Sequence, residues 1–378
     1  MKNKYVYNIC RGKNNMNNKE IKAKLKEYMA IPRVSGYESI MTETFMKDMS
    51  NYTDDVVKDK FGNVIATFKG CDENVPSLMI FTHLDTIGFF ITYISDDGFI
   101  KFDRIGGVPE RVLPGLHVRV GSESGKYYPG VIGNKSYNMM PSGNSVDPIS
   151  SLYIDIGARS REEVESLDIH VGSPVVYDAF YKELLNDRIC GSYLDAASGL
   201  TTLIQLAEDL KDRQNKATVY LVGTVMEEYN ARGAMMAHRV CDADLAICLL
   251  GAGAGDTPEL KGSNNVKLGE GTSVNLFNFH GKGTLNGLIV AKPMLEHLKK
   301  ASETTGVAIQ RQAARGALSD SAYLQLEDDG VMCLDMGTPD RYSHSPVEMI
   351  DLKDFNDTFK IVKEFIDSLD VNFKVERF

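Results

Sequence analysis

Two apolar runs of the chain end in residues that commonly bind metal ions, and these runs limit the folds open to it. Residues 78–81 (LMIF) have the composition of a short buried strand, which Thr82 and His83 close. Residues 217–226 (ATVYLVGTVM) form a second run rich in β-branched residues, and Glu227 and Glu228 follow it. In open α/β sheets, ligands gather at the carboxyl ends of the strands. We therefore expect one rim of a sheet to carry a cluster of imidazole and carboxylate groups.

Helical and strand-like segments alternate from Asp195 to the C-terminus. An amphipathic helix is predicted directly after Asp195, because five apolar residues recur at helical spacing between residues 200 and 210. The strands and helices predicted beyond it are strands 217–226, 245–250 and 331–336, and helices 231–239, 293–304 and 352–369. This alternation predicts an α/β fold, in which helices flank a mostly parallel sheet.

The N-terminal region is predicted to add two helices and a hairpin to this α/β unit. Residues 18–30 place four large side chains on one helical face. Ser35 and Glu38 have the spacing of a capping box, which predicts that a second helix starts there and runs to Met49. Residues 56–69 read as a hairpin around the turn at residues 61–63.

The segment from residue 89 to residue 179 has a different character. It consists of short β-like pieces rich in Gly, Pro and Tyr, with helical periodicity only at residues 160–166. We interpret it as a β-rich satellite domain inserted into the α/β domain, whose two parts would span residues 16–88 and 180–378. Residues 1–15 are basic and read as a weakly ordered tail, unless Met16 is the natural start of the protein.

Composition argues against several classes of partner. The net charge of −10 gives no electrostatic basis for nucleic-acid binding. No stretch approaches the roughly 20 apolar residues of a membrane span, and the N-terminus lacks the apolar segment of a signal peptide. The six cysteines form no CxxC pair, which favours reduced thiols and a cytoplasmic location.

The candidate site residues combine imidazole and carboxylate groups, the ligand set of Zn²⁺ or a similar divalent ion. His83 and Asp85 share one side of an extended segment, so Asp85 either holds the second nitrogen of His83 or binds metal beside it. Neighbouring Glu227 and Glu228 can divide two roles, one binding the metal and the other accepting a proton from water. His344, in a loop after the last strand, and Asp195 complete the set. Each motif alone is weak, and their combination indicates a metallohydrolase.

Eleven ordered motifs extend from the N-terminal helices to the C-terminal region. They are residues 31–32 with 35–38, 61–64, 83–89, 105–107, 111–115, 130–133, 153–158, 227–228, 232–234, 256–258 and 341–346. On these motifs the chain resembles the tetrahedral (glutamyl or deblocking) aminopeptidases. These are co-catalytic metallopeptidases that also carry an endoglucanase-like label.

The resemblance implies a metal-dependent aminopeptidase acting on short peptides, with one or two divalent ions, Zn or Co, per chain. It assigns metal ligation to four residues, with Asp195 bridging two ions: His83, Asp195, Glu228 and His344. It makes Glu227 the general base, and it places Asp85 behind His83 as support. It also implies a homo-oligomer, in which the satellite domain builds dimers that assemble into a hollow dodecamer.

The chain departs from the family pattern at two places. Family members have Asp-Asp-Arg or Asp-Asn-Arg where this chain has Asp195, Ala196 and Ala197. In addition, the strand at residues 245–250 should end in an aspartate that binds the first metal, and Leu250 stands there instead. A leucine cannot bind a cation, so we expect at most one tightly bound metal and low or absent activity.

Two alternatives to an active peptidase remain open at this point. The chain could be a pseudoenzyme or peptide-binding scaffold of the same fold. Glycoside hydrolysis, suggested by the family's second label, needs two carboxylates around a sugar and would leave the histidines without a role.

Overall fold

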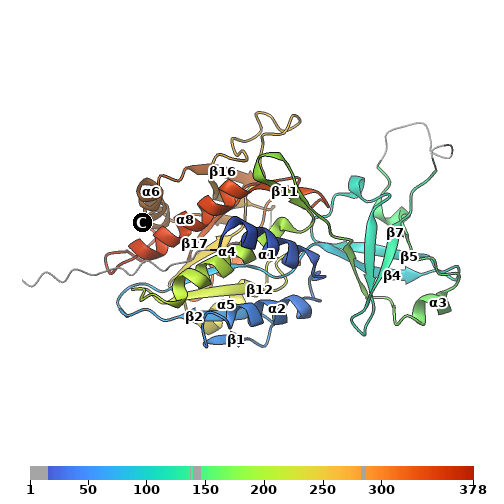
Figure 1. Ribbon diagram of the computed structural model, residues 1–378, viewed down its shortest axis with the longest axis horizontal. Coiled ribbons are helices and arrows are strands. Elements are labelled where there is room, and N and C mark those ends of the chain that lie inside the picture. The colour runs from blue at the N-terminus through green and yellow to red at the C-terminus, as the bar shows by residue number, and fades with distance from the viewer. Residues whose placement is uncertain (1–15, 137, 139–145, 282–286) are drawn as a thin grey trace, which may run out of the picture.

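A computed structural model describes residues 16–136, 138, 146–281 and 287–378. The chain forms an α/β body and a small β-barrel that extends from one end of it (Figure 1). The expected tail, residues 1–15, lies outside the described residues. Among the described residues, no helix is long and apolar enough to cross a membrane.

One mixed sheet organises the α/β body. Its strand order is β1-β2-β12-β3-β13-β17-β14-β15, and β16 also pairs with β14. The strands are β1 (Val56–Lys58), β2 (Val64–Phe68), β3 (Leu78–His83), β12 (Val219–Thr224), β13 (Leu245–Leu249), β14 (Thr272–Phe279), β15 (Gly287–Ile289), β16 (Ile309–Arg315) and β17 (Met332–Gly337). Four neighbouring strands, β12, β3, β13 and β17, run parallel to one another. Strand β2 pairs with β12, and β14 pairs with β17, in antiparallel fashion. The predicted α/β class is confirmed, with the parallel order confined mainly to the centre of the sheet.

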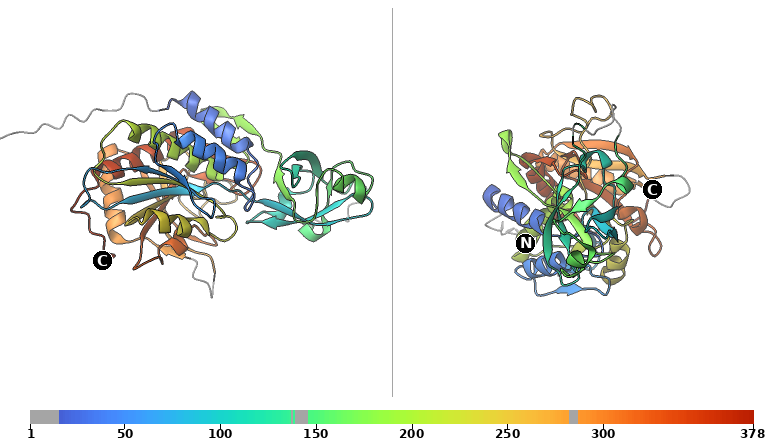
Figure 2. Two further views of the ribbon diagram at one scale, coloured as in Figure 1. Left: turned by 90° about the horizontal axis from the view of Figure 1, so that it is seen from below. Right: turned by 90° about the vertical axis from the view of Figure 1, so that its right-hand side faces the viewer.

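Alternating side chains on the central strands build two hydrophobic layers. In β3, Leu78 and Ile80 join the large core on one face, and Met79 and Phe81 join the smaller core on the other. The helices are α1 (Asn18–Ala30), α2 (Ser39–Met49), α4 (Leu194–Lys211), α5 (Gly233–Cys241), α6 (Lys292–Thr305), α7 (Ser321–Leu324) and α8 (Leu352–Ser368). The first face is covered by α1, α2, α4, α6 and α8, and the second by α5 and α7 (Figure 2). A sheet buried on both sides explains why its strands are continuous apolar runs.

The expected capping box at Ser35 and Glu38 is wrong. Helix α2 begins at Ser39, and no side chain caps it. The Ser35 hydroxyl instead donates to Asp85, and the Glu38 carboxylate accepts the backbone N–H groups of Gly36 and Met226. Tertiary partners at the sheet edge therefore take the polar groups that a local motif would have used.

The inserted β-rich region is a closed barrel with its own core. Its strands, in the order β4-β5-β8-β7-β6-β9, are β4 (Gly88–Ile94), β5 (Ile100–Ile105), β6 (His117–Gly121), β7 (Tyr127–Ile132), β8 (Ile154–Asp155) and β9 (Pro174–Tyr177). A short helix, α3 (Arg161–Glu165), accompanies them, and a separate hydrophobic cluster fills the barrel. The predicted β-rich satellite is thus present, and the exact domain boundaries at residues 89 and 179 stay a prediction.

A second, smaller sheet links the barrel to the body. Its order is β10-β11-β19-β18, with β10 (Tyr181–Glu183), β11 (Arg188–Gly191), β18 (Asp340–Arg341) and β19 (Glu348–Asp351). Because β11 follows the barrel and β18 and β19 follow the last central strand, this sheet brings distant parts of the chain together beside the carboxyl edge of the main sheet.

Candidate metal centre

The carboxyl ends of the central strands place the candidate residues. His83 is the last residue of β3 and is in register with Thr224, the last residue of β12. Glu227 and Glu228 follow β12 after Met226, whose φ of +58° turns the chain sharply. Asp195 lies in the first turn of α4, and His344 lies in the loop between β18 and β19. Residues far apart in the sequence therefore meet at one edge of the sheet.

Asp195 lies between the two histidines. Its Oδ1 is 3.0 Å from His83 Nε2, and its Oδ2 is 3.6 Å from His344 Nε2. His344 Nε2 is also 3.6 Å from Glu228 Oε1. Each oxygen of the Asp195 carboxylate thus faces a different imidazole, which is the arrangement a bridging ligand requires.

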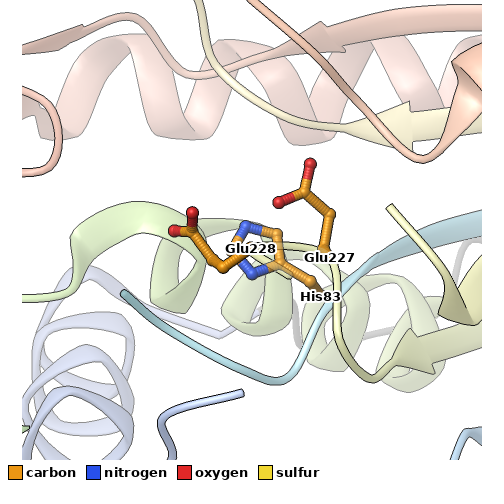
Figure 3. Close-up of side chains that lie close together, drawn as sticks. All are labelled: His83, Glu227 and Glu228. Atoms are coloured by element: carbon orange, nitrogen blue, oxygen red, sulfur yellow. The ribbon is translucent and has the colours of Figure 1, made fainter. Parts of the chain in front are cut away.

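The ligand atoms fall into two groups that share Glu228. In each group, the atoms of the three residues lie within 4.8 Å of one another: His83, Glu227 and Glu228 in one, and Asp195, Glu228 and His344 in the other. Figure 3 shows both glutamate side chains beside the His83 ring. Imidazole nitrogen with carboxylate oxygen suits a divalent cation such as zinc, so these residues fit a metal centre.

The Asp85 carboxylate fixes the two loops that carry His83 and the glutamates. It is completely buried, and it accepts hydrogen bonds from the backbone N–H groups of Glu227 (3.0 Å) and Glu228 (3.0 Å) and from the Ser35 hydroxyl (2.6 Å). Its Oδ1 is 3.6 Å from His83 Nδ1, on the side of the ring away from Asp195. Asp85 therefore lies behind His83, outside both ligand groups.

Glu348 has a similar position on the other side of the site, and the sequence analysis missed it. Its carboxylate accepts the backbone N–H of Asp195 (3.0 Å) and that of His344 (2.8 Å). The residue is buried at the start of β19. The sequence offers only a glutamate four residues after His344, and no local pattern shows that it also holds Asp195, 153 residues away.

A buried arginine, also missed in the sequence analysis, joins the segments around the site. The Arg33 guanidinium is inaccessible to solvent, and it donates to the carbonyl oxygens of Leu84 and Tyr193, each at 3.2 Å. Burial lowers its pKa to about 10, while Asp85 favours the charged form. The charge therefore persists at neutral pH and offsets part of the negative charge of the neighbouring carboxylates.

The electrostatics of the site tie its acids and histidines together. Burial opposes the charged form of His83, but its hydrogen bond to Asp195 and the nearby Asp85 carboxylate raise its pKa well above the ordinary value. Burial likewise opposes ionisation of Asp195, yet its contacts with His344 and His83 lower its pKa. Burial raises the pKa of Glu227 well above its usual range, His83 lowers it, and the neighbouring Glu228 raises it further.

The site opens into a cavity of about 740 Å³. The following residues are among those that line it: Asp195, Glu227, Glu228, His344, Leu250, Asn275 and Asp340. Leu250, directly after β13, is partly buried against the smaller core. Hydrocarbon therefore occupies the position where the resemblance led us to expect a metal-binding aspartate.

The barrel also reaches the site through Gly106 and Gly107. Gly106 has a φ of +79°, and a Cβ there would lie 2.6 Å from Ile87 Cγ2. The Gly107 carbonyl oxygen is 3.2 Å from His344 Nδ1. If this nitrogen carries the proton, His344 Nε2 is left as an acceptor facing Asp195 and Glu228, as metal binding requires.

Comparison with known proteins shows that the chain is similar to aminopeptidases over most of its length. The sequence profile of the M42 glutamyl aminopeptidase family matches residues 62–361. Lysyl aminopeptidase of Pyrococcus furiosus is 29% identical over 351 residues, covering 91% of this chain and 96% of that protein. The aminopeptidase APDkam598 of Desulfurococcus kamchatkensis has a TM-score of 0.88 at 31% identity, covering 94% of this chain and 96% of that one. The Pyrococcus horikoshii TET1 peptidase, described as assembling into a tetrahedron or a large octahedral shell, has a TM-score of 0.81 at 27% identity, covering 92% and 100%.

We predict that His83 stabilises the metal-free protein mainly at low pH. Its pKa is raised on folding, so its contribution is fully present below the ordinary value near 6.5 and is lost as pH rises through the higher folded value. In protein treated with EDTA, His83→Asn should lower the free energy of unfolding by on the order of 3 kcal/mol near pH 6. The loss should shrink as the pH is raised through the folded-state pKa, as measured by urea unfolding.

His297 provides a control, because burial lowers its pKa. The effect of His297→Asn should change with pH in the opposite direction. An equal loss for His83→Asn at both ends of the pH range would show that its pairing with Asp195 does not involve a charged imidazole.

Proposed function

Because the chain belongs to the M42 glutamyl aminopeptidase family, we propose that it is a metal-dependent aminopeptidase that removes N-terminal residues from short peptides. The observation that carries this proposal is the convergence of two histidines and three carboxylates, all of which except His83 line one cavity. The residues are His83, Asp195, Glu227, Glu228 and His344.

We propose that these residues hold divalent cations, Zn²⁺ or Co²⁺. Asp195, Glu228 and His344 would hold one ion, and His83 with the second oxygen of Asp195 would contribute to the other. A cation bound there would polarise the scissile carbonyl group and lower the pKa of the attacking water. Asp85 would act by orienting His83 and by holding the loop that carries Glu227 and Glu228.

Glu227 is the proposed general base. It lines the cavity and lies beside His83, and it is not part of the group formed by Asp195, Glu228 and His344. Burial raises the pKa of Glu227, so its carboxylate takes up a proton more readily than an exposed one would. The residue would accept a proton from the attacking water and deliver it to the nitrogen of the departing peptide.

Leu250 distinguishes this chain from the family pattern, in which an aspartate at this position binds a metal ion. Of the two ion positions, the one near His83 has the smaller ligand set, since Leu250 offers no oxygen. The other keeps three protein ligands, a number that suffices for a catalytic zinc. We therefore propose that each chain binds at most one metal ion tightly and has low activity.

A pseudoenzyme of the same fold is the alternative that Leu250 favours. In that case the cavity would bind peptides, or a single metal ion, without turnover. Glycoside hydrolysis is less favoured, because the carboxylates here are interleaved with two histidines that a metal-independent glycosidase would not use.

We also propose a cytoplasmic homo-oligomer. The five cysteines among the described residues are free, which is compatible with a reducing compartment. The barrel projects from the body (Figure 2) and exposes apolar side chains such as Tyr93 and Val171. A projecting unit of this kind is suited to joining dimers, and the proposed assembly is up to a dodecamer.

Replacing Glu227 by glutamine should remove the base and leave the ion-binding residues in place. We expect kcat to fall by about 10²- to 10⁴-fold, with zinc content unchanged from that of the wild-type protein. Turnover on a peptide library and metal analysis of the same preparations measure both quantities. Equal turnover by the two proteins would contradict the role of Glu227, and no turnover by metal-loaded wild-type protein would favour the pseudoenzyme.

Leu250→Asp should supply the oxygen ligand that the family pattern provides at this position. Metal content should rise from about one to about two ions per chain, with activity rising as well, because two-ion peptidase sites hold both ions with carboxylates. Leu250→Asn is the matched control, since it has the same shape without the charge. Two ions at full occupancy in the wild-type protein would show that Leu250 does not weaken that position.

Light scattering tests the assembly. We expect the wild-type protein to form dimers or larger multiples, because the projecting barrel and its apolar side chains otherwise remain exposed to water. A monomer at every concentration would contradict the proposal.

A further inference from the structure

The cavity beside the candidate metal centre contains two buried acceptor atoms without donors. Asp340 Oδ2 and Asn275 Oδ1 are both shielded from solvent, and neither has a hydrogen-bond partner among the described residues. Both residues line the 740 Å³ cavity. Unpaired buried acceptors cost free energy, so their joint presence in a binding cavity indicates a ligand that brings donors.

The backbone around Asp340 fixes the position of its carboxylate. The Asp340 N–H donates to the Ala252 carbonyl (3.3 Å), and its own carbonyl accepts the Ala254 N–H (2.6 Å). A Cβ built on Gly251 would lie 3.9 Å from Asp340 Oδ1, so this oxygen lies beside the segment between Leu250 and Ala252. The carboxylate is therefore held against the segment that begins with Leu250.

The Asp340 carboxylate is an acceptor suited to a positively charged donor. Burial, followed by repulsion from Asp195, raises the pKa of Asp340 to about 6, and Ser343 and His344 oppose this rise. The buried Glu348 is another nearby acid. A positively charged donor would pair with Asp340 Oδ2, which has no donor among the described residues, in a charge-assisted hydrogen bond.

The geometry favours an organic cation over a metal ion at Asp340. Asp340 belongs to neither group of ligand atoms within 4.8 Å of one another. The amide oxygen of Asn275 is a neutral acceptor that suits an N–H donor. Leu250 and Ala314, also in the cavity wall, offer hydrocarbon surface of the kind that packs against methylene groups.

We propose that Asp340 and Asn275 form a subsite for the ammonium or guanidinium group of a basic N-terminal residue, whose methylene groups contact Leu250. The inference rests on the proposed aminopeptidase function, because the metal centre in the same cavity would hold the peptide's scissile bond. Leu250 would then contribute to substrate binding, as the apolar part of a site for lysine or arginine.

A pair of substrates that differ in the side-chain ammonium tests this subsite. Lysine and norleucine have the same straight carbon chain, and only lysine carries the charge. With fluorogenic aminoacyl amides, the metal-loaded wild-type protein should show a kcat/KM at least about tenfold higher for lysyl than for norleucyl substrate. Asp340→Asn should bring the ratio close to one, mainly by lowering kcat/KM for the lysyl substrate.

The matched control is Asp329→Asn. It removes the same charge from an exposed position before β17, at the opposite end of the strand from the site, and should leave the ratio unchanged. An equal loss on both substrates in Asp340→Asn would overturn the proposal, since it would mean that Asp340 recognises the α-ammonium common to all substrates. Loss of zinc from Asp340→Asn with an unchanged ratio would overturn it in favour of metal binding.

Equilibrium binding separates this inference from the proposed function. Calorimetry with free L-lysine and L-norleucine measures the subsite even if the protein hydrolyses nothing. L-Lysine should bind at least about tenfold more tightly to the wild-type protein than to Asp340→Asn, and L-norleucine should bind both equally. Turnover without any preference for lysine in either assay would refute the subsite and leave the aminopeptidase proposal standing.

Discussion

The candidate site depends on one buried carboxylate, that of Asp85. Three donors converge on it, from the segment after α1 and from the backbone of Glu227 and Glu228, while His83 lies directly beside it. A carboxylate that accepts several N–H and O–H bonds can remain ionised in the interior. The pKa of Asp85 is accordingly lowered although burial opposes this, chiefly through His83. One side chain thus sets the relative positions of two strand ends.

Glu348 repeats this arrangement on the opposite side, where it joins the backbone of Asp195 to that of His344. The two outer carboxylates therefore build a frame, and the inner side chains project from it into the cavity. Sites with this construction hold their geometry because the supporting groups are buried and hydrogen-bonded. Asp85 also adds negative charge, which Arg33 and the histidines partly offset, whereas burial raises the pKa of Glu348 well above its usual range and disfavours its charge.

Much of the fold could be predicted from the sequence because periodicity and burial coincide. The expected helix at residues 18–30 and the expected strand ending at His83 agree with α1 and β3, since each has a regular apolar pattern. Strands β14 and β16, at the margin of the sheet, were not predicted, because polar residues such as Asn275, Gln310 and Gln312 interrupt their apolar pattern. Ser35 misled the analysis for a different reason, since its local spacing suggested a helix cap while its partner lies 50 residues away.

The site residues likewise divide into those that the sequence could identify and those that it could not. His83 and the glutamate pair could be identified because each ends an apolar strand, and the structure places them together with Asp195 and His344. Glu348, Arg33 and Asp340 could not, because their significance lies in contacts that only the folded chain creates. The local sequence around a polar residue does not predict which distant oxygen or nitrogen atom it will contact in the folded chain.

The contact between the Gly107 carbonyl and His344 gives the barrel a part in the chemistry of the α/β body. The barrel supplies a hydrogen-bond partner for Nδ1 of His344, an imidazole in the other unit. A displacement of the barrel relative to the α/β body would therefore alter that hydrogen bond directly. In the proposed oligomer, contacts between barrels would hold this hydrogen-bond partner in place. The quaternary structure would then influence which nitrogen of a single histidine carries a proton.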